Sequence, residues 1–261
     1  MDPASDLFDS HCHLDFPAFD GWRERALAEA RAVGVLEILV PGVTAQHWPR
    51  LLAFCAGDPA LYPALGLHPC FLSEHRPEHL ELLETRLAAG GVRAIGEIGL
   101  DYFIDDADPE SQQYYLEGQL ALASRFDLPV LLHVRKAHDR MLKTLRRARL
   151  GRAGIVHAFS GSGQQARQYI ELGFRLGFGG AISYDRATKL RRLAASLPLE
   201  SLVLETDAPD MPLSDWRDEP NRPQRIRDVF EVLCSLRSEA PEQIARQTTA
   251  NVHEVLALNI A

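Results

Sequence analysis

Two histidines stand two residues apart near the start of the chain, in the stretch DSHCHLD at positions 9–15. Imidazole nitrogens are common ligands for zinc and related divalent cations, at metal–nitrogen distances of about 2.0–2.1 Å. In a strand, His11 and His13 would project from the same face, about 6.6–6.8 Å apart along the chain. The pair could then bind one cation, while Cys12 between them would point to the opposite face and pack against helices.

Other side chains of the metal-binding type recur where we expect strands to end. They are Glu97 in GEIG, His133 in LLHVR, His157 in GIVHAFS and Asp207 in LETDAP. With His11 and His13 these donors are too many for one catalytic ion that keeps an open position, so the pattern predicts two ions. Glu97 suits a bridging role because its carboxylate has two oxygens and its neighbouring glycines allow close approach. Two such ions can activate a water and stabilise charge that develops on a substrate.

The segments that carry these residues alternate between two patterns along the whole chain. Apolar or β-branched runs predict strands at 7–12, 35–42, 61–69, 92–101, 129–135, 154–160, 174–183 and 202–209. Between and after them, helical spacing predicts helices that include 20–33, 109–126, 222–237 and 241–258. This alternation predicts a parallel sheet. Eight units in about 250 residues predict a (β/α)8 TIM barrel of the α/β class, as a single domain over residues 1–261, with an open doubly wound sheet as the alternative.

In a barrel, the carboxyl ends of all strands meet at one rim, which is where barrel enzymes keep their chemistry. We therefore expect His68, near the end of the third predicted strand, to join the six donors at this rim. A polar side chain in a strand buried on both faces needs a partner. The placement thus predicts an active site rather than scattered surface residues.

Composition narrows the class of protein. Hydrophobic residues make up 46% and charged residues 25% of the 261, as in ordinary globular proteins. A net charge of −8 argues against coating nucleic acid or a membrane by bulk electrostatics. The four cysteines are scattered and are expected to be free thiols in a reducing compartment. With neither a signal peptide nor a membrane span expected, we predict a cytoplasmic protein.

Seven motifs, in a fixed order along nearly the whole chain, resemble the TatD family of metal-dependent hydrolases and deoxyribonucleases, within the amidohydrolase superfamily. They are DSHCHLD, GLHP, GEIGLDY, LLHVR, HAFSG, LETDAPD and EPNRP. The resemblance implies a TIM barrel with one ion held by His11, His13 and Asp207. The other ion would be held by His133 and His157, with Glu97 bridging the two. The resemblance also implies cleavage of DNA with divalent metals, often as a 3′→5′ exonuclease.

Roles for the remaining residues follow from their chemistry. We expect Asp207 to bind an ion and to accept a proton from the water that the ions hold. His68 could protonate the leaving oxygen or hydrogen-bond a phosphoryl oxygen, or it could cap the GLHP segment. Arg135 could clamp a phosphate, since its planar fork matches phosphate oxygens, or form a salt bridge. Asn221 and Arg222 could hold the substrate backbone or cap a helix.

The charge of the predicted site favours an anionic substrate. Two divalent ions and two carboxylates would leave a net charge of about +2, which suits a phosphodiester. No long run of Lys or Arg is present to follow a duplex. We therefore predict action on DNA strand ends or short oligonucleotides, with weak, salt-sensitive binding and with no membrane and no obligate protein partner. The ligand types accept zinc, manganese, magnesium or nickel.

Three other functions remain open at this stage. The same metal pair could hydrolyse an amide or ester of the amidohydrolase type, although Glu97 stands where many of those enzymes use a carbamylated lysine. A deacylase that removes D-amino acids from tRNA would keep a nucleic-acid partner but cut an ester. A non-catalytic metal-binding protein would show no loss of cellular function after Glu97→Gln and Asp207→Asn.

Overall fold

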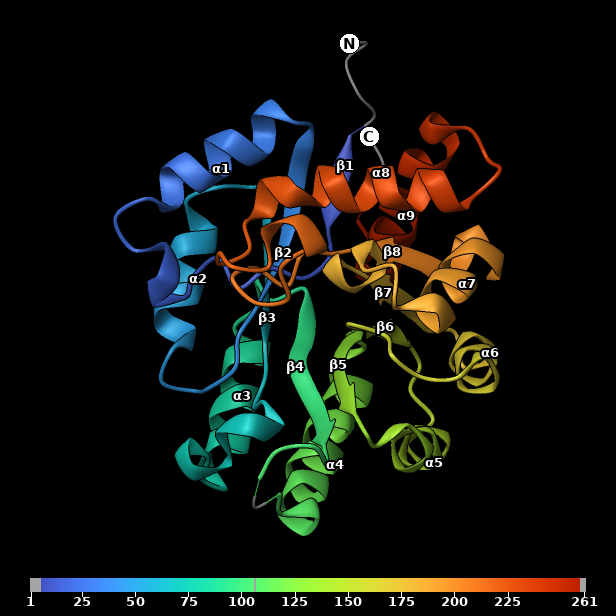
Figure 1. Ribbon diagram of the computed structural model, residues 1–261. Helices are drawn as coiled ribbons and strands as arrows, with labels where there is room; N and C mark the ends of the chain where they lie inside the picture. The colour runs from blue at the N-terminus through green and yellow to red at the C-terminus, as the bar shows by residue number, and fades with distance from the viewer. Residues whose placement is uncertain (1–5, 106, 259–261) are drawn as a thin grey trace. The chain divides into compact units, whose positions relative to one another are not determined.

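Eight parallel strands alternate with helices in the computed structural model, which describes residues 6–105 and 107–258 (Figure 1). In the sheet, the strands follow chain order from β1 to β8. Sequential parallel order with intervening helices is the (β/α)8 TIM-barrel class that the sequence predicted. The chain divides into two compact units, Met1–Val40 with Arg175–Ala261, and Pro41–Phe174, and each is described by itself. That they act as one domain stays a prediction.

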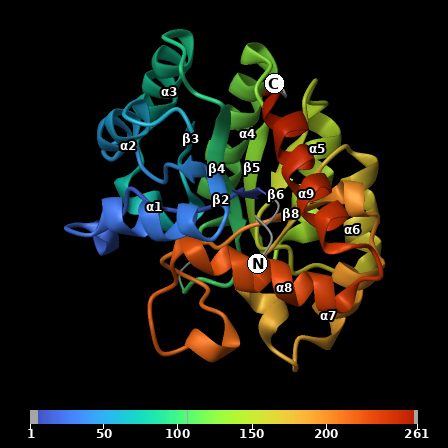
Figure 2. The same ribbon diagram turned by 90° about the horizontal axis from the view of Figure 1, so that it is seen from above.

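The first unit contains the two ends of the chain. Its strands are β1 (Leu7–Asp9), β2 (Val35–Pro41), β7 (Arg175–Phe178) and β8 (Leu202–Leu204). Its α-helices are α1 (Arg23–Ala32), α7 (Thr188–Ser196), α8 (Ile226–Leu236) and α9 (Pro241–Leu256). Short 3-10 helices occur at η1 (Pro17–Phe19), η3 (Gly180–Ser183), η4 (Leu199–Ser201), η5 (Ser214–Trp216) and η6 (Pro223–Arg225). Helix α9 packs against β1 and β8, and Figure 2 shows it beside α8.

The second unit is built around β4 and β5. Its strands are β3 (Leu61–Leu65), β4 (Ala94–Asp101), β5 (Val130–Arg135) and β6 (Gly154–Val156). Its helices are α2 (Trp48–Ala56), η2 (Pro69–Glu74), α3 (Glu78–Ala88), α4 (Pro109–Phe126), α5 (His138–Ala148) and α6 (Gly163–Glu171). Every residue of β4 is buried. Gly99 permits the close approach of β4 to β5, because a Cβ at this position would lie 1.9 Å from the His133 carbonyl oxygen.

Several strands are shorter than the sequence predicted. β1 ends at Asp9, β3 at Leu65, β6 at Val156 and β8 at Leu204, and β7 gives way to a 3-10 helix after Phe178. The expectation that His11 and His13 close the first strand, and that His68, His157 and Asp207 close later ones, is therefore wrong. These five residues follow their strands in loops, whereas Glu97 and His133 lie within β4 and β5.

The loop after β1 leaves the strand because its backbone N–H groups bond to different segments in turn. The Ser10 N–H donates to Leu204 O at 2.9 Å, and the Cys12 N–H donates to Leu39 O at 3.1 Å. The helices match the predictions more closely: α4 has the predicted bounds, α1 begins at Arg23, and the segment predicted at 222–237 divides into η6 and α8.

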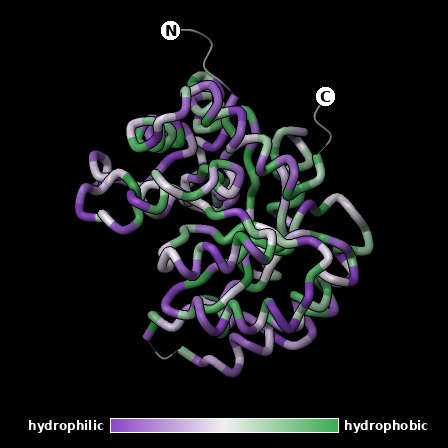
Figure 3. Tube along the Cα trace, turned by 90° about the vertical axis from the view of Figure 1, so that its right-hand side faces the viewer, coloured by the Kyte–Doolittle hydropathy of each residue, from purple (hydrophilic) through white to green (hydrophobic). Residues whose placement is uncertain are grey.

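Hydropathy alternates along the helices, as expected for helices with one buried face (Figure 3). The strands supply much of the apolar core, with Leu39, Leu65, Ile95 and Leu132 among the fully buried side chains. Within residues 6–105 and 107–258, no helix combines the length and apolarity needed to cross a membrane.

Candidate metal centre

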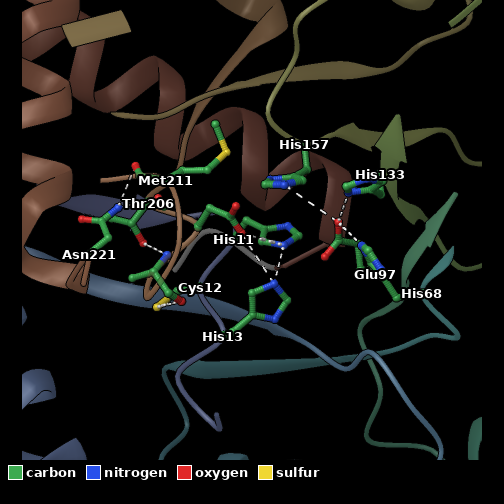
Figure 4. A network of polar contacts seen from close by, with 12 residues as sticks. His11, Cys12, His13, His68, Glu97, His133, His157, Thr206, Met211 and Asn221 are labelled. Atoms are coloured by element: carbon green, nitrogen blue, oxygen red, sulfur yellow. Dashed lines mark hydrogen bonds and ion pairs between the residues drawn. The ribbon is translucent and has the colours of Figure 1, made fainter. Parts of the chain in front are cut away.

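Glu97 is the common contact of a histidine cluster in the second unit (Figure 4). Its Oε1 lies 2.9 Å from His133 Nδ1, 3.2 Å from His68 Nε2 and 3.8 Å from His157 Nε2. Glu97 is 2% exposed, and His68 and His157 are also buried. Glu97, His133 and His157 each offer a ligand atom within 4.8 Å of the others. Four segments of the chain thus bring one carboxylate and three imidazoles together.

His133 is held at its second nitrogen by a further carboxylate. Its Nε2 lies 2.9 Å from Asp101 Oδ2, opposite the contact between Nδ1 and Glu97. Burial lowers the pKa of His133, but the hydrogen bonds with Asp101 and Glu97 outweigh it and raise the pKa above its usual value. For Asp101, burial raises the pKa, while bonds from His133 and the Phe103 N–H lower it to about 2. A carboxylate that accepts the outer N–H of a histidine is the usual support of a metal-ligating imidazole.

His68 is fixed in one orientation by its own loop. Its Nδ1 accepts a hydrogen bond from the Cys70 N–H at 3.1 Å, so Nε2 carries the proton that faces Glu97. The backbone on either side is also held. His75 Nε2 donates to His68 O at 2.9 Å, and Gln119 of α4 bonds both the N–H and the carbonyl of Leu67. The Nε2–H group of His68 is therefore a hydrogen-bond donor whose direction is fixed by the loop.

A second donor group lies in the first unit. The Nε2 atoms of His11 and His13 are 3.3 Å apart. Asp207 Oδ1 lies 3.7 Å from His11 Nε2 and 3.5 Å from His13 Nε2. Asp207 adopts a φ of 58°, in the left-handed region that Asp tolerates better than most residues. The predicted convergence of the two histidines occurs, although in a loop rather than on a strand face.

The Asp9 carboxylate forms hydrogen bonds with both loops that carry this group, the loop after β1 and the loop after β8. The carboxylate accepts from Thr206 Oγ1 at 2.6 Å, from the Thr206 N–H at 3.0 Å and from the His11 N–H at 3.2 Å. The Asp207 N–H also donates to His11 O at 2.8 Å. Burial raises the pKa of Asp9 to about 7, and the hydrogen bonds from Thr206 and His11 oppose this rise. The network sets Asp207 opposite His11 and His13.

Both donor groups fit a divalent cation. A tetrahedral ion with metal–nitrogen bonds of about 2.0–2.1 Å separates its ligand atoms by about 3.3 Å. The distances among His11, His13 and Asp207, from 3.3 to 3.7 Å, are close to this spacing. Buried imidazoles and carboxylates that converge in this way are the donors of zinc, manganese and nickel sites. Cys12 stands outside the group: it is fully buried, and its Sγ lies 3.8 Å from Ala208 O.

The residues expected to bind substrate lie in different surroundings. The Asn221 amide is fully buried and donates to Thr206 O at 2.8 Å and Met211 O at 3.3 Å, while the substrate contact expected of Asn221 stays a prediction. Arg222 lies over the Trp22 ring, with its Cζ 5.3 Å from the centroid. Arg135 stacks on Phe103. Asn221 therefore holds the loop of Asp207, while the two arginines are partly exposed.

Sequence reasoning missed three supporting residues, Asp9, Asp101 and Gln119. A signal for Asp101 was present, because every second residue of a strand lies on the same face, so residues 97, 99 and 101 share one. The register then places Gly99 beside His133, so that Asp101 can reach the ring. No comparable local signal marks Asp9 or Gln119, whose partners are distant in sequence.

Comparisons with known proteins show which family the chain resembles. The family model described as "TatD related DNase" matches residues 8–257. The "Uncharacterized metal-dependent hydrolase YjjV" of Escherichia coli (strain K12) is 49% identical, covering 95% of this chain and 96% of that protein. The crystal structure of YjjV, a TatD homologue, has a TM-score of 0.94 at 47% identity, covering 97% and 98% of the two chains. The "3'-5' ssDNA/RNA exonuclease TatD" of Erwinia billingiae is 31% identical over 97% and 99%.

The fold, the donor groups and these relatives define a metal-dependent hydrolase with a TIM-barrel fold. More specifically, the chain belongs to the TatD family, as its motifs indicated.

Proposed function

We propose that this protein is a deoxyribonuclease of the TatD type, which cleaves phosphodiester bonds at strand ends with the help of two divalent ions. The observation that carries the proposal is the pair of donor groups, one around Glu97 and one formed by His11, His13 and Asp207. A relative at 31% identity carries the name of a 3′-5′ exonuclease for single-stranded DNA and RNA, which supports this substrate class.

We propose two ions because each donor group by itself fits a divalent cation. His11, His13 and Asp207 would hold one ion, His133 and His157 the other, and Glu97 would contact both. When bound, the ions would stabilise negative charge on a phosphodiester and lower the pKa of water toward about 7. Zinc, manganese, magnesium and nickel are all compatible with these donors.

The chain's own residues supply proton transfer and orientation. Asp207 would accept a proton from the attacking water, since a carboxylate is a sufficient base once that water is acidified. His68 would donate its Nε2 proton to a phosphoryl or leaving oxygen, because its Nδ1 accepts from the Cys70 N–H. Asn221 would act only through the backbone of the Asp207 loop.

The protein's charge favours strand ends over internal duplex. The net charge is −8, and the sequence has no long Lys or Arg run to neutralise successive phosphates. Affinity would then come from the metal centre and a few nearby contacts. We therefore expect weak binding that falls with added salt.

A substrate panel tests the proposal. Single-stranded and duplex oligonucleotides, an aminoacyl-tRNA and a dipeptide are each incubated with zinc, manganese, magnesium or nickel. We expect mononucleotide release from single strands, and a kcat about 10²–10⁴-fold lower for Asp207→Asn. The control Asp215→Asn, at an exposed position in η5, should match wild type. Hydrolysis of only the ester or the amide, or an active Asp207→Asn, would overturn the proposal.

A further inference from the structure

An exposed aromatic ring and an arginine form a stacked pair beside the Glu97 cluster, within the second unit. Phe103 follows β4, and its side chain is among the few large apolar ones with more than half of their surface exposed, at 54%. The Cζ of Arg135, the last residue of β5, lies 3.9 Å from the centroid of the Phe103 ring. This distance is well within the range of a cation–π contact, which extends to about 6 Å.

The Asp101 carboxylate, which orients His133, also holds the backbone of Phe103. Asp101 Oδ1 accepts from the Phe103 N–H at 2.8 Å, while Asp101 Oδ2 contacts His133 Nε2 at 2.9 Å. The Tyr102 N–H donates to the Arg135 carbonyl at 2.9 Å. Ring, guanidinium and imidazole are therefore positioned by one small network, so a ligand on Phe103 would lie near Glu97 and His133.

The chemistry of the pair indicates what it binds. Among residues 6–105 and 107–258, the Arg135 guanidinium has no hydrogen-bond or ion-pair partner, so its N–H groups are available to an anion. Stacking on Phe103 occupies the flat face of the guanidinium, whereas phosphate binding uses its edge. A ligand that fits both features has a planar aromatic ring, which can stack on Phe103, and a phosphate close to that ring.

We propose that Phe103 and Arg135 form a nucleotide subsite, in which a base stacks on the Phe103 ring and its phosphate contacts Arg135. This inference rests on the proposed function and deepens it, because it gives a reason for selecting single strands. Bases in a duplex are stacked on each other, whereas an unpaired base can stack on an aromatic side chain. An acidic protein can thus bind the end of a single strand without a continuous row of Lys and Arg side chains.

Binding by the holoenzyme tests the subsite without relying on turnover. The probe is a single-stranded oligonucleotide with 2-aminopurine at its 3′ end and phosphorothioate linkages that resist cleavage. We expect saturable quenching of its fluorescence by wild type and by Phe103→Trp. Phe103→Leu should weaken binding about 10-fold, since stacking on one aromatic side chain is commonly worth 5–150-fold or about 1–3 kcal/mol. Tyr114→Leu, an equally exposed aromatic position on α4, is the control and should bind as wild type does.

Two further measurements separate this inference from the nuclease proposal. For wild type, an abasic 3′ end should raise KM about 10-fold, and for Phe103→Leu the abasic and normal ends should have equal KM. Arg135→Gln should weaken binding of 2-aminopurine nucleotide but not of the nucleoside. Equal quenching and equal KM for wild type and Phe103→Leu, with cleavage intact, would overturn the subsite alone. Quenching that depends on Phe103, without cleavage by wild type under any metal, would support the subsite and contradict the nuclease.

Discussion

The Asp101 carboxylate contacts His133, the Phe103 N–H and the Cys70 thiol. One oxygen contacts the outer nitrogen of His133, and the other accepts from the Phe103 N–H. His133 can therefore direct Nδ1 toward Glu97 in only one ring orientation. At the scale of single residues, the site depends as much on such support as on the donors themselves.

Replacing Asp101 tests this support. Asp101→Asn keeps the size of the side chain but removes the negative charge that stabilises the His133 N–H. We expect metal affinity to fall about 10–100-fold while the fold is retained. Competition with a chromophoric chelator measures the apparent Kd for zinc. Asp127→Asn, at the C-terminal cap of α4, is the matched control and should bind zinc as wild type does. Unchanged affinity in Asp101→Asn would refute the supporting role.

Helix α4 positions two site segments through buried glutamines. Gln119 bonds the N–H and carbonyl of Leu67, the residue before His68, at 2.7 and 3.2 Å. Gln112 bonds the N–H and carbonyl of Asp101, both at 2.8 Å. The two glutamines stand seven residues apart, on one face of the helix. This element therefore acts as a rigid template for the His68 loop and the end of β4.

Replacing Gln119 by leucine should lower the free energy of unfolding. Gln119→Leu would leave a buried N–H and a buried carbonyl without their partner, each at about 1–3 kcal/mol. We expect the free energy of unfolding, from urea denaturation, to fall by about 2–4 kcal/mol. Gln164→Leu, at an exposed position in α6, should change it by less than about 0.5 kcal/mol. Equal small effects in both variants would show that the amide contributes nothing.

His75 predicts a dependence of stability on pH. Burial lowers its pKa below 6.5, which the bond with His68 O opposes. Below pH 6.5 the unfolded chain then binds a proton that the folded chain does not, so this contribution to stability falls as pH falls. His75→Gln should remove the effect, which amounts to at most about 1.4 kcal/mol per pH unit. Urea unfolding of both proteins from pH 7.5 to 5.5 measures it, and parallel curves would contradict the prediction.

Sequence periodicity predicted elements better than it predicted their ends. The bounds of α4 were predictable because an apolar face follows Asp108, which caps the helix by accepting from Glu110 and Ser111 N–H groups. The early ends of β1 and β8 were not, because they depend on bonds between distant segments, such as Thr206 to Asp9. Residue type predicted the six residues that form the two donor groups, and their role as metal ligands stays a prediction. Residue type could not find Asp9 or Gln119, whose roles arise from partners far along the chain.

For the whole molecule, membership of the TatD family and the TIM-barrel fold account for the order of the donors along the chain. The net charge of −8 gives the protein no general attraction for anions, so an anionic substrate would depend on the proposed metal centre for binding. The central claim of the proposal is therefore that the two donor groups hold two ions. Substrate preference depends on that claim, because each proposed catalytic residue acts beside a ligand.

Metal content per chain tests this claim most directly. Inductively coupled plasma mass spectrometry is applied to wild type, His11→Ala/His13→Ala, His133→Ala/His157→Ala and the control His47→Ala/His79→Ala, after equilibration with zinc. The account predicts about two ions in wild type and in the control, and about one in each of the other two variants. Circular dichroism should show that all four proteins are folded. Wild type with no bound ion, or folded variants that keep the full wild-type content, would contradict it.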